Sequence, residues 1–275
     1  MRLDMLLQSV ICHHICTMTY KTIDAAADGE ILLITINRPE TRNSLSIQTL
    51  KELNDAIWSA SFDEKIAGII ITGAGHKAFI SGADISEFKD LTPAKAVEMA
   101  RFGQQTLKRI ETSSKPVLAA INGLAFGGGC ELAMACHLRI AANHASFSQP
   151  EVNLGIMAGY GGTQRLIQYV GKTRAMEMHL TGKVISAAQA LDWGLLNEVV
   201  HIDDLLGRSM EVMKEIASKS PYVISSIIKS VNGYFDSIDD GFQTEVEEFG
   251  HCFEHDDYKE GLAAFYEKRR PVFRK

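Results

Sequence analysis

Two glutamates occur in segments that carry almost no other charge. Glu131 follows Gly127-Gly128-Gly129 and lies in the apolar run Cys130-Glu-Leu-Ala-Met-Ala135. Glu151 lies in Ser148-Gln-Pro-Glu-Val-Asn-Leu-Gly155, ahead of a second glycine-rich stretch. Burial and mutual repulsion separate the proton affinities of two neighbouring carboxylates, so that one can donate a proton while the other accepts one. The pair indicates acid–base chemistry, although a glutamate that only stabilises the first turn of a helix is an alternative for Glu131.

The three glycines before Glu131 lie between an expected buried strand at 117–121 and an expected helix. Glycine allows a positive φ and a close approach of a ligand to the backbone. The N–H groups at a helix N-terminus carry a partial positive charge, which suits a phosphate or an oxyanion formed during a reaction. The run lacks the lysine of G-x-x-x-x-G-K-[ST] and does not follow G-x-G-x-x-G. A tight turn needed only for packing is the alternative interpretation.

A third segment, Phe79-Ile-Ser-Gly-Ala-Asp-Ile85, combines small residues with one carboxylate. The small residues Ser81, Gly82 and Ala83 would let a ligand approach closely. Asp84 is a candidate metal ligand or base, but the favoured interpretation is that it caps a short helix at 86–89.

The elements around these segments alternate between strands and helices. Apolar runs predict strands, and apolar residues at spacings of three and four predict amphipathic helices. Strands are expected at 31–36, 67–72 and 117–121, and helices at 46–60 and 93–111. Beyond residue 200 only helices are expected, at 205–218, 222–231, 238–251 and 258–268. The order predicts an α/β body followed by a helical tail.

Composition excludes several classes of protein. The 275 residues include 28 Lys and Arg against 34 Asp and Glu, a net charge of −6, which argues against nucleic-acid binding by bulk charge. The hydrophobic share of 46% argues against disorder, and no apolar run is long enough to span a bilayer. Five cysteines without a CxxC pair favour a reducing compartment, and we expect a cytoplasmic location.

The first seventeen residues differ from the rest of the chain. Cys12, His13, His14 and Cys16 have the residue types of a metal site. A mis-assigned start or a disordered leader, with Met18 as the true beginning, is the favoured interpretation, and a targeting leader is a weaker alternative. We therefore expect no metal site and leave 1–17 out of the fold.

At the segments described above, the sequence closely resembles the crotonase family, and within it the enoyl-CoA hydratases. The resemblance covers roughly residues 18–275. The matching segments are 36–45, 77–85, 115–123, 127–133, 149–151 and 161–166. It implies a core of repeated ββα turns wound into a spiral (18–204) and a C-terminal helical region (205–275) that forms homotrimers or, as dimers of trimers, hexamers.

The resemblance also implies a reaction and the residues that perform it. The chain would add water reversibly to a 2-enoyl-CoA thioester, with CoA as part of the substrate and no separate cofactor. The backbone N–H groups of Ala83 and Gly128 would form an oxyanion hole around the thioester carbonyl. Glu131 and Glu151 would hold the water between them, one removing its proton and the other delivering a proton to the α-carbon. Fatty-acid oxidation is one of several pathways that use this scaffold.

Further positions within the matching segments are candidate contacts for the substrate or its CoA phosphates. They are Arg38, Lys77, Ser81, Gly82, Asp84, Ile85, Gly127, Gly159 and Tyr160. Lys268 and Arg269 near the C-terminus are weaker candidates, and a solvated charged surface is the alternative for all the basic residues.

Two departures from the hydratase pattern leave alternatives open. Ala158 stands where that pattern has proline, and Tyr160 stands where a small residue is usual. Tyr160 could narrow the acyl pocket, donate a hydrogen bond or cover the site. An enoyl-CoA isomerase, or another CoA-thioester enzyme of this fold, is therefore the main alternative. A non-catalytic CoA- or RNA-binding relative is disfavoured by the intact glutamate pair and, for RNA, by the net charge.

Overall fold

A computed structural model describes residues 19–89 and 92–235, together with 256, 260, 263, 264, 267–269, 272 and 273. The first seventeen residues, including Cys12, His13, His14 and Cys16, lie outside the described residues. So does the helix expected at 238–251, together with most of the one expected at 258–268.

The chain repeats a ββα unit. In three successive units the first strand enters a six-stranded sheet and the second enters a four-stranded sheet. The large sheet has the order β1 (Ile23–Asp28), β2 (Ile31–Ile36), β3 (Gly68–Gly73), β5 (Val117–Ile121), β7 (Leu138–Ala142) and β10 (Glu198–Val200). The small sheet has the order β4 (Ala78–Ile80), β6 (Leu124–Phe126), β8 (Ser146–Ser148) and β9 (Ile185–Ser186). This alternation confirms the expected ββα spiral.

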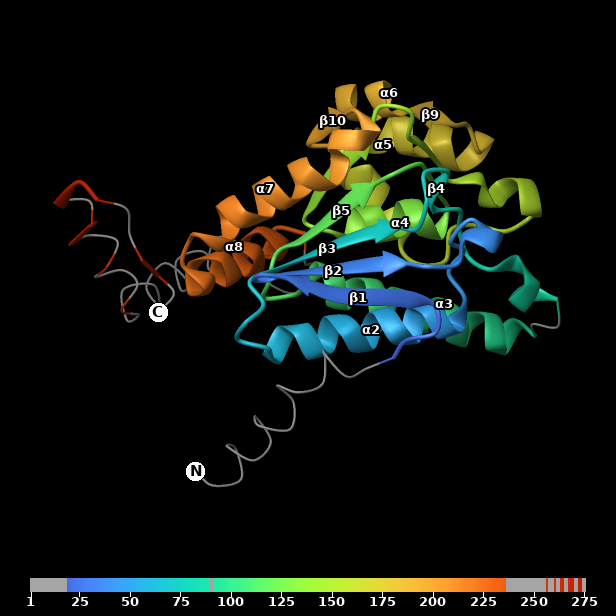
Figure 1. The fold of residues 1–275 in the computed structure, drawn as a ribbon. Helices are drawn as coiled ribbons and strands as arrows, with labels where there is room; N and C mark the ends of the chain where they lie inside the picture. Colours follow the sequence, from blue (N-terminus) through green and yellow to red (C-terminus); the bar gives the residue numbers. More distant parts are fainter. Residues whose placement is uncertain are drawn as a thin grey trace.

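The large sheet is parallel apart from the β1–β2 hairpin and is covered on both faces. Helices α2 (Ile47–Phe62) and α3 (Pro93–Glu111) lie along one face, and α7 (Leu205–Ala217) lies on the other (Figure 1). Alternate residues of one strand therefore enter different cores, as Ile69 and Ile70 of β3 do. Burial on both faces explains why these strands read as unbroken apolar runs.

Several predicted elements are confirmed. Strand 31–36 is β2, strand 117–121 is β5 and helix 93–111 is α3. Helix α2 begins at Ile47, one residue later than predicted, because Ser46 caps it: the Ser46 hydroxyl accepts a hydrogen bond from Thr49 N at 3.1 Å. The helix ends two residues later than expected. The strands of the small sheet, only two or three residues long, were not predicted.

Helix α4 (Gly128–Ala135) lies inside the molecule, and all of its residues are buried. Its C-terminal end is held by the buried Arg139 guanidinium, which donates hydrogen bonds to the carbonyls of Ala133 and Cys136. A cation at this end interacts favourably with the helix dipole. Helix α4 is therefore fixed by the core along its whole length.

The remaining described elements are three helices and the short connections between elements. Helix α5 (Gly162–Thr181) is interrupted at Gly171, and it is followed by α6 (Ala187–Asp192) and, beyond α7, by α8 (Pro221–Gly233). The connections contain short 3₁₀ helices η1 (Pro39–Thr41), η2 (Ile85–Phe88), η3 (Pro150–Leu154) and η4 (Ile202–Asp204). Among the described residues, no helix has the length and apolar character needed to cross a bilayer.

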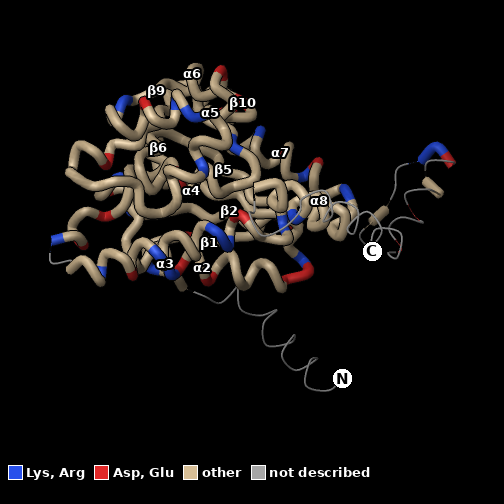
Figure 2. Tube along the Cα trace, turned by 180° about the vertical axis from the view of Figure 1, so that it is seen from behind, with Lys and Arg blue, Asp and Glu red and all other residues tan. Residues whose placement is uncertain are grey.

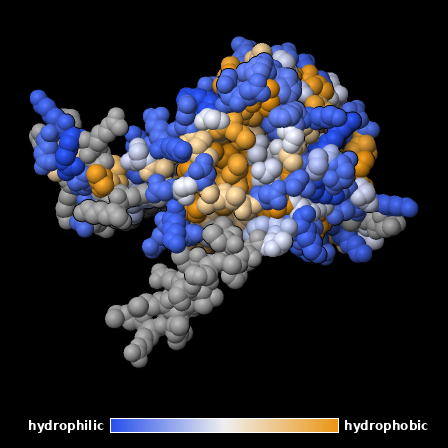
Figure 3. All heavy atoms as spheres, viewed as in Figure 1, coloured by the Kyte–Doolittle hydropathy of each residue, from blue (hydrophilic) through white to orange (hydrophobic). Residues whose placement is uncertain are grey.

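The surface carries mixed charges and some apolar area. Figure 2 shows Lys and Arg interspersed with Asp and Glu over the described part of one side of the molecule. On the opposite side, apolar atoms reach the surface where α7 lies beside the large sheet (Figure 3). Partly buried apolar residues, such as Leu33 and Val200 of the sheet and Met210 of α7, pack against the core on this face. The mixed charges agree with the argument against bulk nucleic-acid binding.

Close packing at the start of α4 generates a stability prediction. A Cβ on buried Gly129 would overlap the Ile80 carbonyl and lie 2.8 Å from Ile80 Cβ, so we expect Gly129→Ala to lower the free energy of unfolding by about 1–3 kcal/mol. Gly207, exposed within α7, has no atom within 4 Å of such a Cβ, so Gly207→Ala should raise it by up to about 1 kcal/mol. Urea unfolding of the two variants measures both effects, and equal changes would contradict the packing argument.

Candidate active site

The three segments singled out in the sequence follow three adjacent strands. Ala83 comes just after β4, Gly128 just after β6 and Glu151 just after β8. Strand β6 lies between β4 and β8 and pairs parallel with both of them. The chain therefore leaves all three strands at the same edge of the small sheet, where ligands bind in open parallel sheets.

The backbone amides of Ala83 and Gly128 lie close together at this edge. A Cβ on Gly128 would be 3.3 Å from Ala83 N. Ala83 is held by a bridge to Leu45, whose N–H donates to Gly82 O at 2.8 Å and whose carbonyl accepts from Asp84 N at 2.9 Å. Among the described residues neither the Ala83 nor the Gly128 amide has an acceptor. Two adjacent N–H groups without acceptors have the arrangement of an oxyanion hole.

Gly127 makes the turn into α4 possible. Its φ is +48°, a conformation that side chains disfavour, and a Cβ there would lie 2.7 Å from Glu151 Oε1. The glycine thus serves two purposes, because it aims the first amide of α4 outward and leaves room for the second glutamate.

The Glu131 carboxylate is almost completely buried in the first turn of α4. Its Oε1 accepts hydrogen bonds from the backbone amides of Tyr160 at 2.8 Å and Gly162 at 2.7 Å. Burial, followed by the negative charge of Glu151, raises the pKa of Glu131 to about 7, while the two N–H bonds act in the opposite direction. The carboxyl group therefore changes protonation state near neutral pH.

The Glu151 carboxylate is half-buried in η3, and burial raises its pKa as well. Its Oε2 is buried and has no hydrogen-bond partner in the described part of the chain. Since buried polar atoms in proteins are nearly always hydrogen-bonded, this oxygen is available to a ligand or a proton.

The two glutamates and the two amides line one cavity of about 770 Å³. Apolar side chains from α3 and from the loop after η3 form most of its wall. The lining includes Phe88, Ala96, Val97, Met99, Ala100, Gln104, Leu154, Ile156, Met157 and Ala158. An apolar cavity with a few convergent polar groups is the usual form of a small-molecule site.

The other predicted contacts are distributed around the mouth and wall of this cavity. Ser81, Gly82, Ile85, Gly127, Gly159 and Tyr160 line it, and Ile85 is 61% exposed. Lys77 is exposed in the turn before β4. Lys268 is also exposed, and Arg269 pairs with Glu260 and Glu267. Which of these contact a substrate stays a prediction.

Asp84, the residue after Ala83, forms an ion pair of 2.8 Å with Arg38. Asp84 also accepts from Ser86 N, which confirms the predicted cap, although the short helix begins one residue earlier than expected. Arg38 donates in addition to Ser44 O, so its guanidinium braces the two segments around Ala83. Hydrogen bonds from the hydroxyl and backbone N–H of Ser86, together with the ion pair with Arg38, lower the pKa of Asp84.

The sequence analysis missed the groups that hold Glu131. The amides of Tyr160 and Gly162 belong to a turn that continues into α5, and Arg165 of α5 donates to Tyr160 O at 2.8 Å. Arg165 in turn pairs with Glu111 at the end of α3. The only signal in the sequence was the glycine pair 161–162, which marks a turn but not its target.

Comparison with known proteins shows close similarity over nearly the whole chain. The family model for enoyl-CoA hydratase/isomerase matches residues 26–275. A short-chain-enoyl-CoA hydratase from Clostridium acetobutylicum is 41% identical over 88% of this chain and 94% of its own length. A crotonyl-CoA hydratase from Syntrophomonas wolfei is 42% identical over 93% and 99%. The crystal structure of an enoyl-CoA hydratase from Bacillus anthracis, 36% identical, aligns with a TM-score of 0.87 over 92% of this chain and 99% of its own.

The environment of Glu131 predicts a pH-dependent stability. Its folded pKa of about 7 lies above the 4.5 of an exposed glutamate, so the folded protein keeps a proton that the unfolded chain releases. The free energy of unfolding should therefore fall as pH rises from 4.5 to 7, by at most about 3 kcal/mol. Glu131→Gln keeps an oxygen acceptor for the two amides and removes this dependence. We expect the variant to exceed the wild type in stability by more at pH 8 than at pH 5.

Urea unfolding at the two pH values measures the difference, and titrating groups that do not interact with Glu131 cancel because they are common to both proteins. Glu64→Gln, at an exposed loop position, is the matched control and should show the same difference at both pH values. If the difference in the free energy of unfolding between Glu131→Gln and the wild type is also the same at both pH values, the raised pKa of Glu131 is contradicted.

Proposed function

The chain belongs to the enoyl-CoA hydratase/isomerase family and is an enoyl-CoA hydratase, and we propose that its reaction is carried out by Glu131, Glu151 and the amides of Ala83 and Gly128. The reaction adds water to a 2-enoyl-CoA thioester and gives a 3-hydroxyacyl-CoA. The observation that carries the proposal is that both carboxylates and both amides without acceptors line one cavity.

The two amides polarise the thioester. When they donate to the carbonyl oxygen, electron density moves toward that oxygen and C3 becomes electrophilic. Hydrogen bonds of this kind stabilise the enolate that forms as water attacks C3, and one such donor is typically worth about 3 kcal/mol. Because both donors belong to the main chain, only small residues at 83 and 128 keep the approach open.

We assign Glu131 as the group that takes the proton of the water. Its Oε1 is occupied by two N–H donors, which favour the ionised form and leave the other oxygen for the water. Glu151 receives no hydrogen bond from another residue in the described segments, so we assign to its buried Oε2 the proton that C2 takes up. Water then bonds to C3 as Glu131 removes its proton, and Glu151 delivers a proton to C2. The reverse sequence eliminates water.

The binding of CoA, the assembly and the location remain part of the proposal. We assign the phosphate contacts to the exposed Lys77 and Lys268, since Arg38 is paired with Asp84 and Arg269 with Glu260 and Glu267. We propose a cytoplasmic location. The reducing compartment expected from the cysteines agrees with Cys130 and Cys136, which are buried and not disulfide-bonded.

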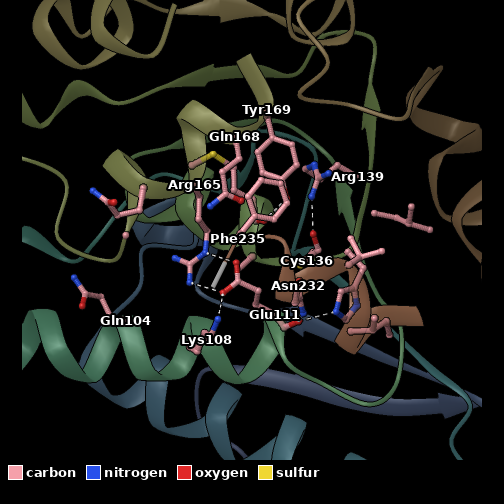
Figure 4. Close-up of a pocket in the computed structure, with 18 of the residues that line it drawn as sticks. Gln104, Lys108, Glu111, Cys136, Arg139, Arg165, Gln168, Tyr169, Asn232 and Phe235 are labelled. Carbon is pink, nitrogen blue, oxygen red and sulfur yellow. Dashed lines mark hydrogen bonds and ion pairs between the residues drawn. The ribbon is translucent and has the colours of Figure 1, made fainter. Parts of the chain in front are cut away.

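The trimer, or the hexamer built from two trimers, is supported by an apolar face on α8. A second cavity of about 810 Å³ lies between α8, α5 and the end of α3 (Figure 4). Ile227 and Val231 of α8, together with Phe235 just after it, line this cavity and are each more than half exposed. We propose that a neighbouring subunit covers this face, because large exposed apolar areas usually mark interfaces.

Substitution of either glutamate tests the proposed mechanism. We expect Glu131→Gln and Glu151→Gln each to lower kcat for hydration of crotonyl-CoA by at least two orders of magnitude, roughly the worth of a positioned acid or base. Loss of the enoyl-thioester absorbance measures the rate, and Glu64→Gln should retain wild-type turnover.

Near-normal turnover in either variant would remove that glutamate from the mechanism. A wild-type protein that moves the double bond of a 3-enoyl-CoA without hydrating crotonyl-CoA would instead favour the isomerase reaction.

A further inference from the structure

The side chain of Tyr160 lies between two glycines that belong to different helices. A Cβ on Gly103 of α3 would overlap the ring, with the ring Cγ only 2.7 Å away. On the other side, a Cβ on Gly128 would lie 3.4 Å from ring Cδ2. The residue is only 5% exposed. The missing side chain of Gly103 therefore creates a notch in α3 that holds the ring.

The backbone of Tyr160 cannot move independently of the catalytic groups. Its N–H donates to Glu131, and its carbonyl accepts from Arg165 at 2.8 Å. The preceding residue, Gly159, accepts from Gln104 of α3 at 3.1 Å. The ring is thus held at a fixed place relative to Glu131 and to the oxyanion amide of Gly128.

The ring lies at the boundary between two cavities. Tyr160 lines the cavity that holds the glutamates, whereas the next residue, Gly161, and Arg165 line the second cavity. Gln104 lines both, and Figure 4 shows it with Arg165 around the second cavity. Tyr160 therefore belongs to the part of the first cavity's wall that adjoins residues of the second cavity.

We propose that Tyr160 is the end wall of the acyl pocket and restricts this enzyme to short 2-enoyl chains. The inference rests on the proposed function, which places the thioester carbonyl at Ala83 and Gly128. Because the ring contacts the position of Gly128, an acyl chain that extends from this carbonyl toward α3 meets the ring within a few carbons. The Tyr160 hydroxyl is buried and has no partner among the described residues, so a Tyr160→Phe variant is needed to separate the effect of the hydroxyl from that of the ring volume.

Chain-length preference tests the wall. We would measure kcat/KM with 2-butenoyl-CoA and 2-octenoyl-CoA for the wild type, Tyr160→Ala and Tyr160→Phe. Each methylene that becomes buried is worth about a fourfold gain. We expect Tyr160→Ala to raise the octenoyl-to-butenoyl ratio at least about tenfold, and Tyr160→Phe, which keeps the ring, to preserve the wild-type ratio. An unchanged ratio in Tyr160→Ala would overturn the proposal.

The notch provides a second, independent test. Gly103→Ala displaces the ring toward the cavity, so we expect kcat/KM for 2-butenoyl-CoA to fall at least about tenfold. In the Tyr160→Ala background the same substitution has no ring to displace, and it should change kcat/KM less than about threefold while raising Tm, because alanine favours helix. Equal losses in both backgrounds would overturn the coupling between the notch and the ring.

Binding separates this inference from the proposed function. Dissociation constants for butyryl-CoA and octanoyl-CoA, measured by calorimetry, require no turnover. If Tyr160 is the wall, Tyr160→Ala strengthens binding of octanoyl-CoA relative to butyryl-CoA at least about tenfold, even in a protein that fails to hydrate crotonyl-CoA. Tyr160→Leu keeps an apolar side chain packed against Gly103 and should shift the same binding ratio in the same direction. This variant takes the place of Tyr160→Ala if Tyr160→Ala does not fold. If the protein hydrates crotonyl-CoA but the binding ratio is unchanged in both variants, the proposed function stands and Tyr160 does not limit the acyl chain.

Discussion

A carboxylate buried at the start of an apolar helix is the constraint around which this structure is organised. An ionised Glu131 without hydrogen bonds would be too costly to bury, and the amides of Tyr160 and Gly162 supply those bonds. To deliver them, the chain after η3 must turn back toward α4. That turn is held from outside by Arg165, which is itself paired with Glu111. The loop, α5 and the end of α3 are thus linked to one another through the hydrogen bonds that stabilise the Glu131 carboxylate.

The small sheet brings the remaining groups to the same carboxylate. Because β4, β6 and β8 are parallel neighbours, the segments that follow them emerge together, although they are far apart in the sequence. The larger sheet contributes no group to the site. Its role is to bury most of the apolar surface and to hold α3, whose inner side forms one wall of the cavity.

Local patterns in the sequence predicted those parts of the protein that depend on local forces. Helix 93–111 has a proline in its first turn and apolar residues at helical spacing, and strand 117–121 is an unbroken apolar run, so both were found at their true bounds. The three-residue strands of the small sheet are too short for any periodicity. The partners of Glu131 are main-chain groups, which no residue type reveals. Gly103 lacks a side chain at the place where the Tyr160 ring packs against α3. Such a contact between residues far apart in the sequence can be seen only in the folded chain.

The oxyanion donors that we propose belong to the main chain, so substitution affects them differently from the two carboxylates. Substitution of a side chain cannot delete the amide of Ala83 or Gly128; it can only obstruct it. In the proposed mechanism, the ability to stabilise an enolate is therefore inherited with the fold, whereas the proton transfers depend on two replaceable carboxylates. A scaffold of this kind can exchange its second chemical step by a few point mutations while the first step persists, which makes reaction type a more labile trait than thioester activation.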